Sequence, residues 1–179
     1  MSDMFSRAAA RIKNMIARAV ITAVNDAAKM QTVQISLLAD EVKGGVERFQ
    51  QYGFTGVPRE GAEALALFLG GSRSHGIVIA VDDRRYRLKG LEKGEVALYD
   101  DLGQKVHLTR DGIEIVAPTV TVKAENGMRV EAPQLACTGD IVDRCDGDGV
   151  SMSSMRETYN GHNHPGDSGG NTGTPNQDM

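Results

Sequence analysis

Large aromatic side chains are scarce in this sequence of 179 residues, which holds four Phe, four Tyr and no Trp. Aromatic rings supply much of the buried area of compact cores. Their scarcity beside 21 glycines argues against one large globular core and favours an extended or repetitive body. Cysteine is rarer still, because Cys137 and Cys145 are too few for a disulfide framework. We expect both to be small buried thiols, with a slight preference for a reducing compartment.

Neither a surplus of positive charge nor a long apolar run is present. The chain has 20 Lys and Arg against 24 Asp and Glu, a formal net charge of −4. Without a basic surplus to neutralise phosphates, we expect no nucleic-acid partner. No apolar run approaches the ~20 residues that a membrane-spanning helix requires, so we do not expect an integral membrane protein.

The N-terminal segment, residues 1–29, has a helical pattern. Apolar side chains from Met4 to Val24 recur near one side of a helix. Basic residues such as Arg7, Arg11 and Lys13 interrupt it, so it lacks the uninterrupted apolar stretch of a signal peptide. We expect a helix that docks on a partner subunit or on its own neighbour, in preference to one that lies on a membrane surface.

Residues 30–100 have the pattern of a small β-barrel. Val33, Ile35 and Leu37 alternate with polar residues, as in a half-buried strand. Further short apolar runs are bounded by glycine or proline, at 49–54, 64–69, 77–81 and 95–99. A short helix for 63–69 stays open. Five strands in ~70 residues predict a Greek-key barrel of the OB type.

Residues 101–158 have a different, repetitive character. Turn or strand-end residues separate apolar pairs that begin about seven or eight residues apart, closer than in a sandwich or barrel. From Asp100 to Thr158 the sequence contains no aromatic residue. The apolar positions are Val106/Leu108, Ile113/Ile115, Val120/Val122, Met128/Val130, Leu135/Cys137 and Ile141.

Strands this short and narrow cannot close a core within one chain. Burial is marginal even in well-packed small domains, and stacked repeats overcome this by burying a continuous seam against their neighbours. One chain is too thin for a solenoid of its own, so the pattern favours several identical chains wound around one axis. We therefore predict a mainly β protein in which residues 101–158 form an intertwined β-helical rod.

The segment 159–179, which we treat as the apex, contains the only dense group of chemically active side chains. In an extended strand His162 and His164 point to the same side, and imidazole is the commonest metal ligand in proteins. One chain supplies only two such ligands. If three chains met on an axis, six nitrogens would converge, which suits an octahedral ion such as iron(II) better than tetrahedral zinc.

Enzyme motifs near this pair are incomplete. Residues 166–170 spell Gly-Asp-Ser-Gly-Gly, the nucleophile signature of trypsin-like proteases, whose chemistry needs a base His, a buried Asp and two preceding barrels. Residues 162–165 resemble the metal motif of JAMM deubiquitinases, but the serine and aspartate that should follow are Thr172 and Pro175. We interpret both matches as coincidences.

An acidic cluster precedes the apex. Counted from Asp146, the twelfth position of an EF-hand loop is Glu157, but the fifth and sixth are Val150 and Ser151, so no EF-hand is predicted. Solvated turns are the preferred interpretation, and a weak calcium site between chains stays open. The cluster consists of Asp140, Asp143, Asp146 and Asp148.

With a rod and a histidine tip in view, the chain resembles the central spike of contractile-tailed bacteriophages, the Mu-like baseplate assembly protein V. The residues that carry the likeness are 57–72 in the barrel, the repetitive strands from Val106, and His162-x-His164 followed by Pro165-Gly166. The resemblance implies a homotrimer with an OB-fold domain attached to the tail hub and a trimeric β-helix that tapers to a point. It also implies one iron ion shared by three chains at His162 and His164; some family members hold calcium and chloride inside the spike.

The function that the resemblance implies is structural. Made in the host cytoplasm, the protein would be placed in the virion, at the tip of the tail baseplate, and driven through the host outer membrane without catalysis. Two alternatives stay open. One is a metal-dependent hydrolase that uses His162, His164 and an aspartate such as Asp167. The other is a trimeric tail fibre or adhesin with a receptor-binding head.

Overall fold

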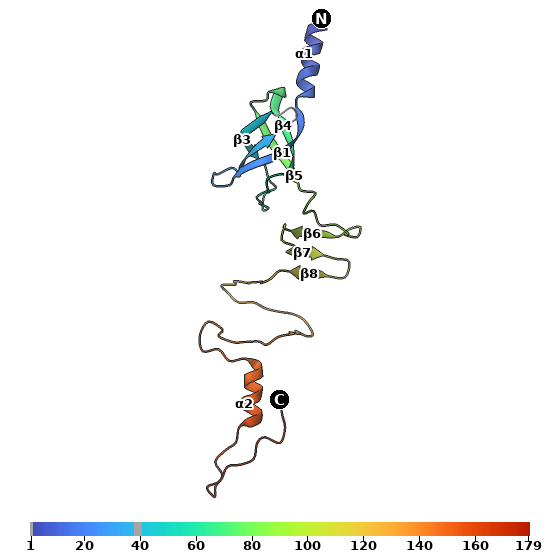
Figure 1. Ribbon diagram of the computed structural model, residues 1–179. Helices are drawn as coiled ribbons and strands as arrows, with labels where there is room; N and C mark the ends of the chain where they lie inside the picture. The colour runs from blue at the N-terminus through green and yellow to red at the C-terminus, as the bar shows by residue number, and fades with distance from the viewer. Residues whose placement is uncertain (1, 38–40) are drawn as a thin grey trace. The chain divides into compact units, whose positions relative to one another are not determined.

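The computed structural model describes residues 2–37 and 41–179, and its internal contacts divide the chain into two units, residues 1–121 and 122–179. The first unit contains helix α1, a barrel formed by β1 to β5, and a three-stranded sheet formed by β6 to β8 (Figure 1). The second unit contains helix α2, Met152–Gly161. Within the described residues no helix is both long enough and apolar enough to cross a membrane.

The N-terminal helix is shorter than the sequence predicted. Helix α1 comprises Ser2–Lys13, and strand β1 follows at Ile16–Asn25, so the expected helix from Met4 to Val24 is wrong beyond Lys13. The strand is rich in β-branched residues, which favour a pleated, half-buried surface. It pairs with β2 and β4 and buries Ala19 and Ile21. Pairing within the barrel therefore outweighs the helical pattern.

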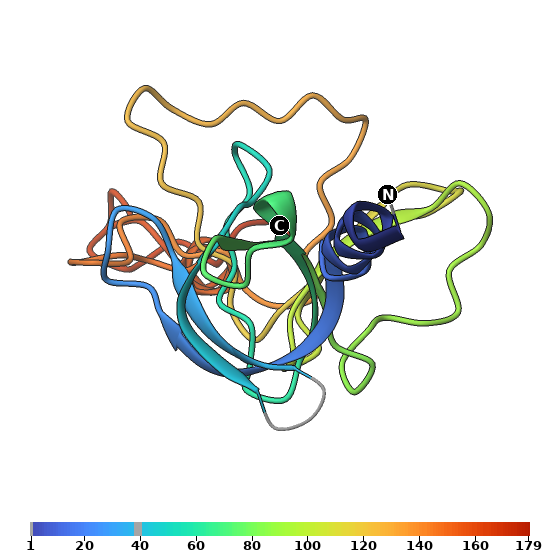
Figure 2. The same ribbon diagram turned by 90° about the horizontal axis from the view of Figure 1, so that it is seen from above.

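The five-stranded barrel predicted from the sequence is confirmed. Its strands are β1, β2 (Thr32–Ser36), β3 (Val42–Arg48), β4 (Glu63–Phe68) and β5 (Gly76–Asp82). They close in the order β1-β2-β3-β5-β4, and β4 pairs back onto β1. Only the β3–β5 pair among the described barrel strands is parallel. This is an OB-like arrangement, and Figure 2 shows the strands curving around a common centre.

In strands β2 and β4 the barrel interior is built by alternation of side chains. In β4, buried Ala64, Ala66 and Phe68 alternate with half-buried neighbours. Phe68 is the largest fully buried side chain, and its ring lies over Gly76, where an added Cβ would come within 2.9 Å of it. All buried apolar residues of the described chain lie between Ala19 and Val78. Every described residue after Val78 is therefore at least partly exposed.

Two strands were assigned wrongly from the sequence. The run 49–54 is not a strand, because the third barrel strand is β3, which lies just before it. The run at 95–99 does form a strand, β6 (Val96–Tyr99), but it belongs to the separate sheet with β7 (Lys105–Leu108) and β8 (Ile113–Val116). The missing barrel strand is supplied by β1 instead.

Residues 117–179 contain no strand longer than an isolated bridge in the described chain. The bridges join Val142 to Ser151 and Pro165 to Asn171. Helix α2 was not anticipated, because residues 152–158 were expected to be part of a β-rod. Its start could have been found from Ser151, whose hydroxyl accepts a hydrogen bond from the amide of Ser154 and so caps the helix.

Candidate functional site

The β6–β8 sheet has one fully apolar face. Because cross-strand partners share a face, the pairing places Val96, Leu108 and Ile113 in one row. Leu98, Val106 and Ile115 form a second row on the same face. Five of these six side chains are between 46% and 70% exposed, and Val106 is half-buried. We call these six residues the apolar sheet face; nothing in the described chain covers it.

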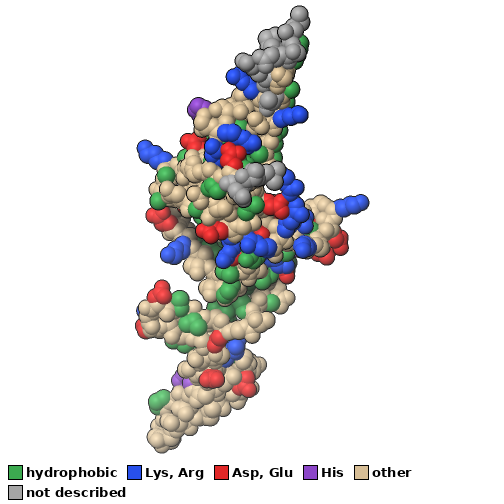
Figure 3. Space-filling view, turned by 45° about the horizontal axis from the view of Figure 1, so that its top comes forward, with side chains coloured by type: hydrophobic (Ala, Val, Ile, Leu, Met, Phe, Trp, Pro, Cys, Tyr) green, Lys and Arg blue, Asp and Glu red, His purple; other side chains and the backbone are tan. Residues whose placement is uncertain are grey.

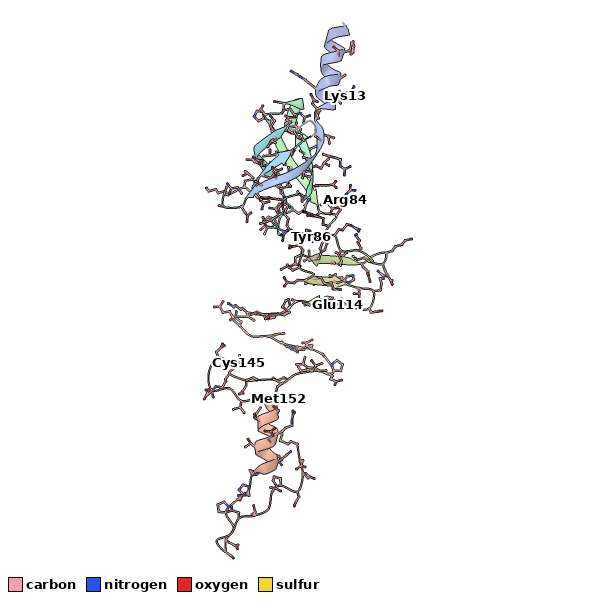
Figure 4. The ribbon with its side chains drawn as sticks, in the orientation of Figure 1. Lys13, Arg84, Tyr86, Glu114, Cys145 and Met152 are labelled. Carbon is pink, nitrogen blue, oxygen red and sulfur yellow. The ribbon has the colours of Figure 1, made fainter. Side chains whose placement is uncertain are left out.

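The opposite face of the sheet carries charged groups. The Lys105 ammonium lies 2.6 Å from a carboxylate oxygen of Glu114, which is labelled on β8 in Figure 4. The next cross-strand position holds His107, whose Nε2 lies 3.1 Å from Glu95. Backbone amides of Glu92 and Arg110 also donate to Glu95, and the Glu92 amide contributes most to lowering the pKa of this carboxyl. The charged groups named on the polar face thus find their partners within one chain, whereas most side chains of the apolar sheet face remain exposed to solvent.

The charged surface of the barrel differs from that sheet. Lys, Arg, Asp and Glu side chains are interspersed over its visible face in Figure 3, as on an ordinary hydrated surface. The exposed apolar pairs continue after the sheet instead, with Val120 at 59%, Met128 at 69% and Leu135 at 69% exposure. Cys137 and Cys145, expected to be buried, are free and exposed in the single chain.

The acidic cluster builds turns. The Asp140 carboxylate accepts hydrogen bonds from the backbone amides of Ile141 and Ser153, at 3.0 and 3.2 Å, and from the Ser153 hydroxyl. Asp143 accepts from the amide of Val150 at 3.0 Å, and Asp148 pairs with Arg144. No three His, Cys, Asp or Glu side chains gather in a metal-binding group in the part of the chain that the structure describes. Asp140 thus holds the start of α2 through Ser153; Met152, the first residue of this helix, is labelled in Figure 4.

Titration of Asp140 should report how firmly α2 is held. The Ser153 hydroxyl is the main cause that lowers the pKa of Asp140 from 3.8 to about 2. Because folding lowers the pKa of Asp140, its ionised carboxylate stabilises the folded chain fully at a pH above the ordinary pKa of 3.8. This stabilisation is lost as the pH falls through about 2. We expect the NMR shifts of the Ile141 and Ser153 amides to titrate with that midpoint.

The matched variant for this titration is Ser153→Ala. It removes the principal hydrogen-bond donor and should move the Asp140 midpoint upward, toward 3.8. An unchanged midpoint in this variant would contradict the assignment of Ser153 as the main cause.

The structure brings the two predicted histidines together at the end of α2. His162 follows the last helical residue and is extended, with φ −73° and ψ 151°. The centroids of its ring and that of His164 lie 5.1 Å apart in an edge-to-face arrangement, and the Tyr159 ring is 5.4 Å from His162. His164 is fixed by a hairpin, since its amide donates to the Thr172 hydroxyl and its carbonyl accepts from the Thr172 amide.

One ring nitrogen of His162 is already occupied. Its Nδ1 lies 2.6 Å from the carbonyl oxygen of Tyr159, and a carbonyl can only accept, so Nδ1 carries the hydrogen. In the neutral ring Nε2 then has a free lone pair, which is the usual state of a metal-binding histidine held by a carbonyl. This orientation could not be read from the sequence, because it depends on where α2 ends.

The described residues do not form the arrangements that the protease-like motif and the hydrolase alternative would require. Residues 166–170 form the turn of the hairpin, in which the amide of Gly166 donates to the carbonyl of Gly170 at 2.6 Å. Among the described residues neither histidine is hydrogen-bonded to Ser168, as a protease would require. Asp167 does not join His162 and His164 in a three-ligand group within the described chain.

Comparison with known proteins gives two kinds of match. The family model described as Bacteriophage Mu Gp45, N-terminal, matches residues 18–85, which include all five barrel strands except the start of β1. The baseplate puncturing device gp45 of Escherichia phage Mu is 42% identical over 177 residues, covering 91% of this chain and 89% of the relative. The Mu-like prophage FluMu protein gp45 of Haemophilus influenzae is 35% identical over 160 residues, covering 84% and 85%. The similarity therefore extends well beyond the barrel.

Proposed function

This chain belongs to the family of Mu gp45 baseplate puncturing devices, and from that premise we propose that it is the central spike of a contractile tail. It is a structural protein of the virion baseplate, at the tail tip, where it pierces the host envelope; it is not an enzyme. The finer parts of the proposal are a homotrimer, a trimeric β-helix, a metal-bound apex and attachment to the tail hub.

The observation that carries the trimeric part is the apolar sheet face. Six Val, Leu and Ile side chains lie in register on one side of a sheet whose other side is complete. Leaving them in water would forfeit roughly 1.5–3 kcal/mol for each large side chain. Three copies of such a face around one axis would enclose a narrow apolar interior without aromatic rings, which agrees with the composition of residues 101–158.

The trimer would also explain why residues 117–141, which were predicted to form short strands, form none in the single chain that the structure describes. Their apolar pairs recur with the spacing of short strands, but within the described chain these segments pair with no other strand. In a trimer, backbone hydrogen bonds between chains would satisfy them, as stacked repeats do in a solenoid. Such interchain ladders would give the rod the stiffness that a piercing device needs.

The apex of the proposed spike is held by His162 and His164 from each chain. The Nε2 atom of His162 is free to bind a metal and the two rings are adjacent, so the residues fit an ion shared among chains. Six imidazole nitrogens suit iron(II), and the bound ion would join three chain ends. Calcium and chloride rest on the family resemblance alone, since Asp140 and Asp143 are engaged in their own turns.

Assembled tails provide the test of piercing. Tails that carry the full chain should release a dye from outer-membrane vesicles when they contract, whereas tails that carry residues 1–100 alone should release almost none. The shortened chain retains every buried apolar residue of the barrel and is expected to fold. Immunoblotting of the purified tails would establish that it is incorporated. Equal dye release by both kinds of tail would contradict the spike function.

A further inference from the structure

The connection between β3 and β4 carries an uncharged, aromatic surface. Three of the eight aromatic residues of the chain fall within residues 49–58, which we call the aromatic loop, and no charged residue occurs there. Phe49 is 49% exposed, Phe54 is 61% exposed, and Tyr52 is fully exposed. Aromatic side chains are enriched, and charged ones depleted, in the buried centres of protein interfaces.

The aromatic loop is fixed to the barrel. The Arg48 guanidinium donates to the carbonyl of Gly56 at 2.6 Å and to the side-chain oxygen of Gln31, which is itself 5% exposed. Gln31 also donates to the Gly56 carbonyl, and the amide of Phe49 donates to the carbonyl of Val78, which prolongs the β3–β5 pairing. A loop held in this way presents its rings without a large loss of conformational entropy on binding.

A turn determines where the tip of the loop points. The amide of Phe54 donates to the carbonyl of Gln51 at 3.0 Å, and Gly53 between them has φ +86°. That conformation suits glycine at the third position of a type II turn and leaves Tyr52 at the corner. The fully exposed ring at this corner is thus a consequence of backbone geometry.

An open groove of about 390 Å³ lies beside the loop. Its apolar lining comes from the loop, from β5 and from β6, namely Phe49, Phe54, Ile79, Ala80, Val81 and Leu98. Leu98 also belongs to the apolar sheet face. The groove and that face therefore meet at Leu98, and a molecule that covers the face at Leu98 would reach the groove, whose lining also includes Arg48 and the polar side chains of Gln50, Gln51 and Thr55.

We propose that the aromatic loop docks on a second copy of this chain, at the partner's own groove and loop, and so extends the trimer contact from the sheet to the barrel. This inference rests on the proposed trimer. In a cyclic trimer, identical side chains meet only where they lie at the threefold axis. Charged loops would repel one another there, whereas residues 49–58, which carry no charge, would not. The continuity through Leu98 favours a sister chain over a different protein.

The absence of Trp from the chain provides a clean probe. In the Tyr52→Trp variant, the single indole of the purified full-length protein should emit at a shorter wavelength and be quenched by acrylamide several-fold less than the indole of Lys89→Trp. Lys89 is the matched control, because it is exposed, lies outside the loop and has no ion pair among the described residues. In guanidinium chloride the two variants should become equally quenchable.

The solution mass of each variant separates the two possible failures. If the protein is a trimer and the indole of Tyr52→Trp is quenched as easily as that of Lys89→Trp, the docking is overturned and the trimer stands; the loop would then be free for a different partner. If the protein is a single chain, both the trimer and the docking fail. A trimer in which the indole of Tyr52→Trp is protected supports the proposal, and Phe54→Gln should then weaken assembly about tenfold, as loss of an interface ring does.

Discussion

A single Ile115→Asp substitution should reduce the mass of the protein in solution from that of three chains to that of one 19.2 kDa chain. Ile115 lies in the row with Leu98 and Val106 on the apolar sheet face and is 56% exposed in the single chain. In the proposed trimer it would point toward the axis, where three carboxylates would be buried without partners. Such burial costs several kcal/mol per chain. Sedimentation equilibrium of the purified variant measures the result.

The control is the same substitution one residue further along, Val116→Asp. Val116 is 41% exposed and lies on the opposite face of β8, directly across from Lys105, which could accept the new charge. This variant should remain a trimer, because the apolar sheet face is untouched. The trimer would be refuted if the unaltered protein sedimented as a single chain. If both variants stayed trimeric, the sheet face would be excluded as the contact.

The second large effect concerns the apex. The unaltered protein should contain about one iron per three chains, and His162→Ala combined with His164→Ala should contain none. An ion bound at a free concentration about a thousandfold above its dissociation constant stabilises the folded form by ~4 kcal/mol. The double variant should lose stabilisation of this order, measured by elemental analysis and by unfolding in guanidinium chloride.

His75→Ala is the matched control for this experiment. His75 is exposed, and its hydrogen bonds within the described chain involve only its backbone, so loss of its ring should change neither metal content nor unfolding. The hydrolase alternative predicts a different pattern, in which the double variant loses turnover while its trimer and stability are kept. Iron retained by the double variant would exclude the histidine pair as the ligands.

The barrel was largely predictable from the sequence because β2 alternates buried and more exposed residues, and because glycine bounds the apolar runs of β4 and β5. Val33 and Ile35 are both buried as the alternation predicts, and β4 and β5 lie where their glycine boundaries indicate. The errors were at β1, which was expected to be helical, at residues 49–54, which were expected to be the strand that β3 supplies, and at β6, which belongs to the separate sheet. Residues 16–25 could be helical in isolation, and only pairing with β2 and β4 makes them a strand.

The candidate site could be predicted from the sequence only in part. The spacing of His162 and His164 predicts two rings on one side, and the structure places them 5.1 Å apart. The sequence did not predict helix α2, the hydrogen bond from His162 to Tyr159, or the role of Asp140 in holding the helix start. These features depend on where one helix begins and ends, and its end leaves a carbonyl for the imidazole.

By itself the sequence determined that residues beyond the barrel lack the large side chains and the burial pattern of a single-chain core. Alternating apolar pairs without rings already imply a narrow interior, because volume and periodicity are properties of the residues themselves. Only the tertiary structure decided which strands close the barrel, and that Val96, Leu108 and Ile113 share one uncovered face while Glu95 and His107 complete the other. The physical reason is that strand register and face are fixed by hydrogen bonds between segments distant in sequence, which no local pattern specifies.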